Sequence, residues 1–171
     1  PDIEHRFWIV GRNDRVETIS QLVNQYERII LFCRTKHGCD RLAKQLDNSG
    51  VRSSIIHGNK SQAQRERSHE EFRRGRSNVL VATDVAARGI HIDDVPCVVH
   101  FDPPADHKDY IHRSGRTGRA GSKGVVISLV DNSQKRTVNK LARDAGVDAD
   151  FIAPDFEAAD PDQIDARPGA C

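Results

Sequence analysis

Short apolar runs rich in Val, Ile and Leu alternate along this chain with polar segments in which apolar residues recur at helical spacing. The apolar runs predict buried strands, and the polar segments predict helices. The predicted strands span residues 5–10, 28–33, 52–57, 78–82, 97–101 and 124–130, and the predicted helices span 14–26, 35–48, 61–72, 106–112 and 132–145. This alternation predicts a three-layer α/β fold, with helices on both faces of a mainly parallel central sheet.

Two of the predicted helices begin with capping residues. Thr35 is suited to accept a hydrogen bond from the first turn of the helix that follows it. Ser61 and Gln64 form the capping-box pattern at the start of the next helix. These signals place both helix starts directly after loops that follow apolar strands.

Polar or basic residues follow several of the predicted strands. They occupy the loops 34–36, 57–60 and 83–89, and we group the segment 110–121 with them. Because ligands of parallel sheets bind beyond the carboxyl ends of the strands, we expect these four segments to contribute to a binding region.

Charge is distributed unevenly along the chain. Residues 131–171 carry 5 Lys and Arg against 9 Asp and Glu, whereas the first 130 residues carry 21 against 16. The basic excess of the first part permits an anionic partner. From residue 148 the chain is rich in Ala, Asp and Pro without helical or strand periodicity, so we expect one domain over 1–147 to be followed by a partly disordered tail or linker over 148–171.

Several classes of protein are disfavoured by composition. No apolar run approaches the roughly 18–20 residues that span a bilayer, so no membrane contact is expected. The four cysteines, Cys33, Cys39, Cys97 and Cys171, form no C-x-x-C pair, which argues against a disulfide framework or a metal site and favours a reducing, cytoplasmic setting. The chain contains no Met and begins at Pro1, so we expect a fragment of a longer protein. We also expect this fragment to be monomeric.

The segment 110–121, with the sequence YIHRSGRTGRAG, carries the strongest chemical signal. Arg113, Arg116 and Arg119 recur every three residues, with glycines at the same spacing. Arginine presents a fork of donors that fits phosphate oxygens, and glycine allows another surface to approach closely. A solvated basic helix end is the alternative. Glycines cost about 1 kcal/mol each inside a helix, which favours a phosphate site with Arg116 and Arg119 as its contacts.

The chain lacks the motif that usually cradles a nucleoside triphosphate. No G-x-x-x-x-G-K-[ST] sequence is present, and no acidic strand end is placed to hold Mg²⁺ in the usual way. The arginines would therefore act on a nucleotide that a separate domain holds, in the manner of an arginine finger.

The same segment closely resembles the last helicase motif of the DEAD-box RNA helicases. Residues 81–90 (VATDVAARGI) resemble the fifth motif of this family, residues 30–35 (ILFCRT) the fourth, and residues 62–72 the element after it. Residues 56–58 resemble the strand-end His-Gly pair. The resemblance covers about residues 3 to 141. It implies the C-terminal, second RecA-like domain of an ATP-dependent RNA helicase, a P-loop NTPase-like fold without the P-loop, with ATP and Mg²⁺ held mainly by an N-terminal RecA-like domain.

The resemblance also implies roles for individual residues. Arg116 and Arg119 would reach the γ-phosphate, with Arg119 as the finger, while His112 and Arg113 would couple the two domains. Gly89 and the residue at His91 would lie at the nucleotide. The RNA backbone would be held, without reading of its sequence, by Thr35, Gly58, Gln62, Arg65, Thr83 and Gly89.

Simpler structural roles are open for four residues in these motifs. Thr35 and Gln62 are suited to stabilise the first turns of helices, a role compatible with RNA binding. An ion pair inside the domain explains the presence of Arg88 at least as well as contact with RNA does. A structural hydrogen bond is the better account of Asp84.

His91 departs from the family pattern, which most often has an aspartate there that contacts the ribose of the nucleotide. An imidazole can donate or accept a hydrogen bond, but it supplies no carboxylate. We therefore expect weaker discrimination of the ribose. In the alternative, His91 points to solvent and Asp93 or water takes the role.

Two other functions are compatible with these motifs. The chain could belong to a superfamily 2 helicase that acts on DNA, although many DNA-directed relatives carry glutamine where His112 stands. It could also be a non-catalytic RNA-binding or docking module.

Overall fold

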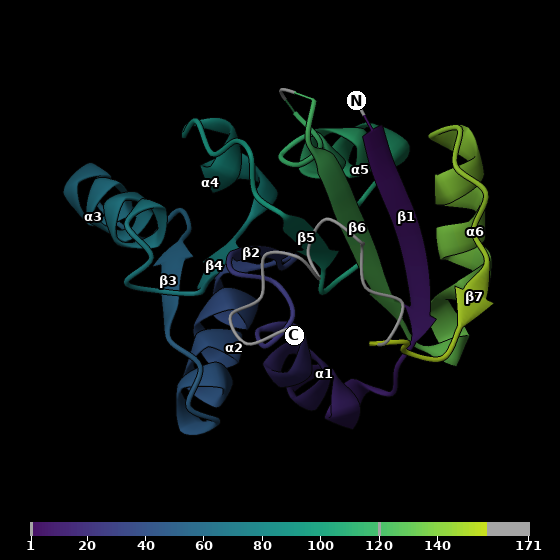
Figure 1. Ribbon diagram of the computed structural model, residues 1–171, viewed down its shortest axis with the longest axis horizontal. Helices are drawn as coiled ribbons and strands as arrows, with labels where there is room; N and C mark the ends of the chain where they lie inside the picture. Colours follow the sequence, from purple (N-terminus) through teal and green to yellow (C-terminus); the bar gives the residue numbers. More distant parts are fainter. Residues whose placement is uncertain (1, 120, 157–171) are drawn as a thin grey trace, which may run out of the picture.

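The computed structural model describes residues 2–119 and 121–156. Its centre is an all-parallel sheet of seven strands in the order β3-β4-β2-β5-β6-β1-β7 (Figure 1). The strands are β1 (Asp2–Ile9), β2 (Ile29–Phe32), β3 (Ser53–Ile56), β4 (Val79–Ala82), β5 (Cys97–His100), β6 (Lys123–Val130) and β7 (Phe151–Ile152). The predicted parallel α/β sheet is confirmed.

Helices cover both faces of this sheet. They are α1 (Arg15–Leu22), α2 (Lys36–Asn48), α3 (Gln62–Arg73), α4 (Asp84–Arg88), α5 (His107–Ser114) and α6 (Lys135–Asp144), with short 3-10 helices at Arg12–Asp14 and Asn132–Gln134. Buried side chains of α1 and α2 pack on one face, and those of α3 to α6 pack on the other. The fold is therefore the predicted three-layer α/β/α arrangement.

The central strands β2 and β4 are apolar throughout because both of their faces are buried. In β2, Ile29 and Leu31 join the core beneath α1 and α2, whereas Ile30 and Phe32 join the core on the opposite face. This explains why a run of consecutive apolar residues, rather than an alternating pattern, marked the strands in the sequence.

Both predicted helix caps are present. The hydroxyl of Thr35 accepts a hydrogen bond from the backbone N–H of Gly38 at 2.9 Å. Ser61 and Gln64 exchange the two hydrogen bonds of a capping box, at 3.1 and 2.8 Å. The starts of α2 and α3 are thus held by their own side chains.

Two elements were not predicted. The five-residue helix α4 lies in what was expected to be a loop, and β7 lies in the segment expected to have no strand. β7 pairs with Phe7 and Trp8 of β1, and Phe156 packs edge-on against Trp8 with ring centroids 5.2 Å apart. The sheet therefore extends past residue 147. The predicted tail is wrong over these residues, and 157–171 lie outside the described part of the chain.

The described residues also bear on the expectations from composition. Cys33, Cys39 and Cys97 are free and buried. Within residues 2–119 and 121–156, no three His, Cys, Asp or Glu side chains are grouped so that they could hold a metal ion. No helix in the same part of the chain has the length and apolar character needed to cross a membrane.

Candidate functional site

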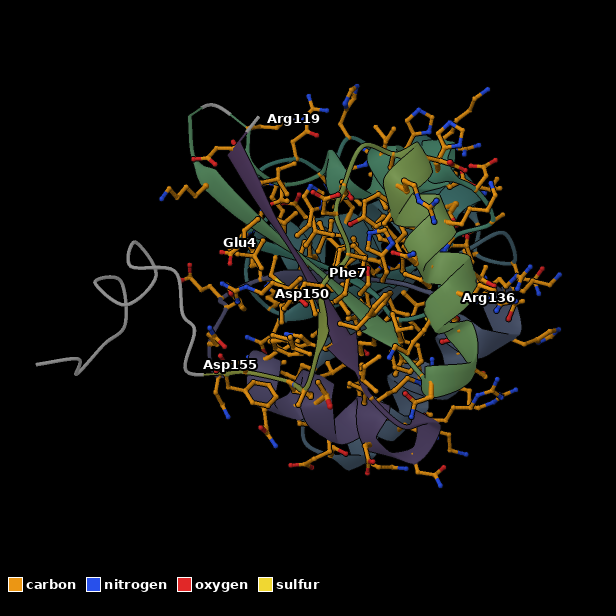
Figure 2. All side chains as sticks on the ribbon, turned by 90° about the vertical axis from the view of Figure 1, so that its right-hand side faces the viewer. Glu4, Phe7, Arg119, Arg136, Asp150 and Asp155 are labelled. Atoms are coloured by element: carbon orange, nitrogen blue, oxygen red, sulfur yellow. The ribbon has the colours of Figure 1, made fainter. Side chains whose placement is uncertain are left out.

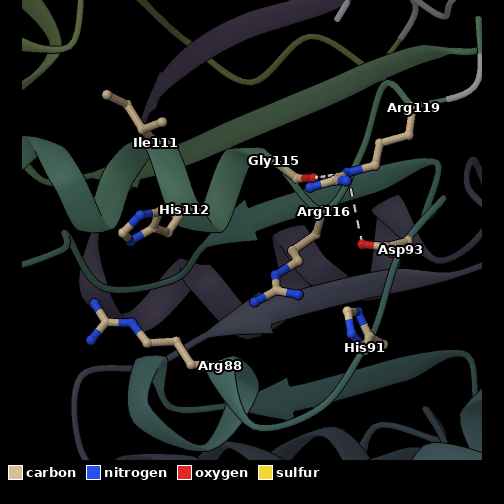
Figure 3. Close-up of a pocket in the computed structure, with 8 residues that line it drawn as sticks. All are labelled: Arg88, His91, Asp93, Ile111, His112, Gly115, Arg116 and Arg119. Atoms are coloured by element: carbon tan, nitrogen blue, oxygen red, sulfur yellow. Dashed lines mark hydrogen bonds and ion pairs between the residues drawn. The ribbon is translucent and has the colours of Figure 1, made fainter.

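An open cavity of about 520 Å³ brings together most of the residues predicted to face the nucleotide. It lies between the end of α4, the loop before β5 and the last turns of α5 (Figure 3). Its lining consists of Arg88, His91, Asp93, Ile111, His112, Gly115, Arg116 and Arg119. Three arginines face one carboxylate, so the cavity favours an anionic ligand.

The two predicted finger arginines are held differently. Arg119 is largely exposed; its Nε donates to the carbonyl oxygen of Gly115 at 2.8 Å and lies 3.7 Å from Asp93 Oδ1. Arg116 is half-buried and its Nη2 donates to the carbonyl oxygen of Ala87 at 3.3 Å. Burial lowers the pKa of Arg116, with an opposing effect from Asp93. Arg119 is therefore the arginine with the greater freedom to reach a ligand.

Arg113 does not fit the expected contact with another domain. Its side chain is 1% exposed, and its Nε and Nη2 donate to the two carboxylate oxygens of Asp84 at 2.6 and 2.8 Å. Its Nη1 donates to the carbonyl oxygen of Asp102 at 2.7 Å. Every nitrogen of the Arg113 guanidinium therefore has a partner in its own domain, so any part of Arg113 in coupling two domains would be indirect. His112, its neighbour, is exposed and lines the cavity.

The structural roles that the sequence suggested for Asp84 and Arg88 are present, and both residues belong to α4. Asp84, its first residue, makes the structural ion pair with Arg113, and Arg88, its last residue, makes an ion pair with Asp109 of α5. Two ion pairs therefore join α4 to α5, one buried and one partly exposed.

His91 and Asp93 both line the cavity, on the loop between α4 and β5. Both are exposed, and among residues 2–119 and 121–156 the one ion pair of the Asp93 carboxylate is the 3.7 Å contact with Arg119. An imidazole and a carboxylate are thus both available where the resemblance places a contact with the ribose.

The glycines of the segment 110–121 have more than one purpose. Gly118 has φ +71°, and a Cβ there would lie 2.7 Å from Ile3 Cγ1 and 2.9 Å from the Asp2 carbonyl oxygen. Close packing against β1 therefore requires glycine at this position. Gly115 lines the cavity instead. The interpretation that these glycines serve approach by another surface is wrong for Gly118.

The position of this segment also differs from the prediction. It begins within α5 and ends before β6, so its later residues lie at the amino ends of β6 and β1 rather than beyond the carboxyl end of a strand. Arg113 lies on α5, and Arg116 and Arg119 follow the last residue of this helix, Ser114.

The residues predicted to contact RNA follow three neighbouring strands. Thr35 follows β2, Gly58 follows β3 and Thr83 follows β4, and these strands are adjacent in the order β3-β4-β2. Gln62 lies on α3, Arg65 one turn later, and Gly89 directly after α4. The Lys36 ammonium donates to the Asn59 amide oxygen at 3.1 Å, joining the start of α2 to the loop after β3. We call the six residues predicted to contact RNA the strand-end strip: Thr35, Gly58, Gln62, Arg65, Thr83 and Gly89.

Sequence reasoning missed a buried residue that organises the strand-end strip. The imidazole of His57 is 1% exposed, its Nε2 lies 2.8 Å from Asp40 Oδ1, and its Nδ1 accepts from the backbone N–H of Asn59 at 3.1 Å. Because Nδ1 accepts, Nε2 must carry the proton and donate to Asp40. The strand-end His-Gly pair in the sequence was the available signal.

The donor set of the cavity fits the phosphates of a nucleotide better than a metal ion. Arginine and histidine side chains are suited to phosphate oxygens. Asp93 is the single carboxylate in the lining among the described residues. A cation that accompanied the nucleotide would need most of its ligands from elsewhere.

Residues 14–121 match the family described as Helicase conserved C-terminal domain, and the chain belongs to this family. The chain is of the DEAD-box type, with the C-terminal RecA-like fold. It is 33% identical to the Escherichia coli DEAD-box protein SrmB, solved bound to regulator of ribonuclease activity A, with a TM-score of 0.81 and 92% of each chain covered.

Two further relatives are similar over most of this chain. Saccharomyces cerevisiae Dbp5, solved bound to RNA and ADP BeF3, is 33% identical with a TM-score of 0.76, over 88% of this chain and 41% of Dbp5. DEAD-box ATP-dependent RNA helicase 30 of Arabidopsis thaliana is 43% identical over 136 residues, which are 78% of this chain and 23% of that protein. The chain spans less than a third of the length of the curated relatives it matches.

Proposed function

We propose that this chain is the catalytic second half of an ATP-dependent RNA helicase. In this role it holds the RNA backbone along the strand-end strip and supplies Arg119 and Arg116 to ATP that a first RecA-like domain binds. The proposal rests on the cavity that Arg116, Arg119, His112 and His91 line together. The chain contains no triphosphate-binding loop that could hold a nucleotide in this cavity. An incomplete cationic site requires a second surface to present the phosphate.

The proposed mechanism is closure of two domains around their ligands. ATP, with Mg²⁺ held mainly by the first domain, supplies the bond whose cleavage drives the cycle. Arg119 exchanges its contacts with Gly115 and Asp93 for the γ-phosphate and neutralises the charge that develops there. The Nη2 of Arg116 donates to the carbonyl oxygen of Ala87, and this hydrogen bond orients the guanidinium. His112 faces the first domain from the same wall.

The strand-end strip supports binding to RNA without sequence preference. Its members offer hydroxyl groups, an amide, an arginine and exposed backbone, which are suited to phosphates and sugars. Closure on the strip would bend the strand and separate a short duplex locally. The similar protein Dbp5 is solved bound to RNA and ADP BeF3, which supports binding of both kinds of ligand here. Matched RNA and DNA duplexes in an unwinding assay test whether the substrate is RNA.

The cellular setting forms part of the proposal. The reduced thiols of Cys33 and Cys39 are buried close together, and their hydrogen bond raises the pKa of Cys33. Two neighbouring free thiols fit a reducing compartment, so we propose that the protein is cytoplasmic. We also propose that it acts as a monomer.

Replacing Arg119 with alanine tests the proposed function. Arginine fingers contribute about 10³–10⁵ in rate to related reactions, so Arg119→Ala should lower the kcat of the full-length ATPase at least several-hundred-fold. Its midpoint of thermal unfolding should hardly change, because the exposed side chain has few contacts. Arg136→Ala on α6 is the matched control, since Figure 2 shows Arg136 projecting from a different part of the molecule. Unchanged turnover in Arg119→Ala would refute the proposal.

His91 provides a second test at the same site. We expect ATP and its 2′- and 3′-deoxy forms to support turnover with more similar KM values than in a variant with aspartate, His91→Asp. Both side chains can reach a ribose hydroxyl, but the carboxylate accepts two hydrogen bonds. Strong discrimination that is identical in both proteins would assign the contact to Asp93 or water instead.

A further inference from the structure

A second cavity, of about 580 Å³, lies beyond the carboxyl ends of β1, β2, β5 and β6. Residues that follow these strands form its wall: Val10, Arg34 and Thr35, Phe101 to Pro103, and Asp131. It shares no residue with the lining of the nucleotide-facing cavity. At Thr35 it meets the strand-end strip, so the two surfaces are continuous.

Four arginines line this second cavity: Arg12, Arg15, Arg34 and Arg41. The two carboxylates there are already engaged. Asp102 accepts from Arg15 Nη1 at 3.1 Å and from the backbone N–H of Arg34 at 2.9 Å. Asp131 accepts from the Ser133 backbone N–H at 2.8 Å and from Arg12 Nε at 3.3 Å.

The guanidinium groups of Arg34 and Arg41 have no hydrogen-bond or ion-pair partner among residues 2–119 and 121–156, and both side chains are exposed. Two uncompensated positive charges on a concave wall concentrate positive potential in the cavity. The first turn of α2, which opens on the same space, adds to it.

The one aromatic ring of the lining is not available for base stacking. The Arg15 guanidinium lies over the ring of Phe101, with its carbon 3.8 Å from the ring centroid. Binding in this cavity would therefore depend on charge and hydrogen bonds to a phosphate, not on a base.

We propose that this second cavity is a phosphate subsite that extends the RNA path beyond Thr35, with Arg34 and Arg41 as the groups that contact the phosphodiester backbone. This rests on the proposed function, because it assigns a continuation of the same bound strand. The ligand class is single-stranded RNA recognised through its phosphates, independent of sequence.

Titration of the ¹⁵N-labelled chain tests this assignment by nuclear magnetic resonance. A short oligouridylate should shift the amide signals of Arg34, Gly38 and Arg41 together with those of 58–65 and 83–89. Shifts confined to 58–65 and 83–89 would overturn the subsite and leave the proposed function standing. No shift anywhere would overturn both. Shifts of Arg34 and Arg41 with inorganic tripolyphosphate but not with RNA would overturn the subsite in favour of a free phosphate ligand.

The salt dependence of RNA affinity gives an independent measure. Each phosphate contact on a single strand contributes about 0.7 to the slope of log K against log salt concentration, so Arg34→Gln with Arg41→Gln should make that slope shallower by about 1.4. Arg34→Lys with Arg41→Lys should retain the slope, because the charges remain. Arg76→Gln with Arg143→Gln removes the same charge outside the cavity and should leave the slope unchanged. Equal slopes for the two glutamine pairs would overturn the subsite.

Discussion

His57 holds the loop that carries Gly58 through two hydrogen bonds, which can be broken separately. In His57→Asn the amide oxygen replaces Nδ1 and keeps the bond from the Asn59 N–H, while the contact with Asp40 is lost. In His57→Gln the amide nitrogen reaches Asp40 and the bond to Asn59 is lost. A neutral hydrogen bond contributes about 1 kcal/mol, so His57→Gln should weaken binding of oligouridylate about five-fold, measured by fluorescence anisotropy.

We expect His57→Asn to affect RNA affinity less, because Asp40 is half-exposed and can bind water instead. Its effect should appear mainly in the free energy of unfolding. An equal loss of affinity in both variants would show that His57 only stabilises the domain.

His100 makes the stability of the domain dependent on pH. Burial lowers the pKa of His100 well below its ordinary value, and the nearby Arg113 and His5 act in the same direction. The folded domain therefore keeps this imidazole neutral, whereas the unfolded chain takes up a proton below about pH 6.5. Stability is accordingly present above that pH and is lost as the pH falls below it, by up to about 1.4 kcal/mol per pH unit for this residue.

Urea unfolding at about pH 6.5 and about pH 5.5 measures this loss. His100→Asn can still accept from Arg113 but cannot titrate, so its free energy of unfolding should fall less over the same interval. His37→Asn, at an exposed position on α2, is the control and should behave like the unchanged chain. If His100→Asn shows the same slope, His100 is not the group responsible.

Sequence reasoning succeeded at residues whose role depends on neighbours along the chain. The caps at Thr35 and Ser61 are local, and so their geometry follows from spacing alone. The burial of Arg113 was not predicted, because its partners, Asp84 and Asp102, are distant from it in the sequence. Gly118 was misjudged for the same reason, since only the assembled sheet brings β1 against it.

Among the elements, strands buried on both faces were the most predictable. α4 was missed because five residues contain too little periodicity to indicate a helix, and its position depends on the ion pairs with α5. β7 was missed because two residues show no strand pattern, and its pairing is decided by the apolar edge of β1. Both missed elements are stabilised by contacts distant in sequence.

The segment containing β7 should stabilise the domain, although the sequence suggested a tail. The ring of Phe151 packs against Phe7 with centroids 5.8 Å apart, and Phe156 packs against Trp8. A chain that ends at Val147 loses both aromatic contacts and the pairing with β1. We expect its free energy of unfolding to be about 2–4 kcal/mol lower than that of a chain ending at Phe156.

Trp8 is the single tryptophan and reports on the same contact. Its fluorescence emission should shift to longer wavelength in the chain that ends at Val147, because removal of Phe156 exposes the indole to water. Equal stability and emission of the two chains would place the domain boundary at 147, as the composition suggested.

At the scale of the whole molecule, α4 connects the two candidate surfaces. Thr83, directly before α4, belongs to the strand-end strip, and Arg88, at its end, lines the nucleotide-facing cavity. The buried Arg113–Asp84 pair fixes α4 to α5, and α5 leads directly into Gly115, Arg116 and Arg119. We therefore expect a displacement of Thr83 on binding RNA to reach the arginines through the Arg113–Asp84 ion pair.

Asp84→Asn tests this connection because it preserves the shape of the side chain and removes its charge. Removing one partner of a buried ion pair costs about 3–5 kcal/mol, a large part of the about 5–15 kcal/mol that stabilises a domain. We therefore expect Asp84→Asn to unfold at a lower urea concentration than the unchanged chain, and to remain folded when no urea is present.

In the full-length enzyme, stimulation of ATP turnover by RNA should fall more than turnover without RNA, because the arginines no longer respond to Thr83. Arg119→Ala should lower both rates together. If Asp84→Asn loses stability but keeps full stimulation by RNA, the pair supports the fold alone, and the connection between the two surfaces must run through other contacts.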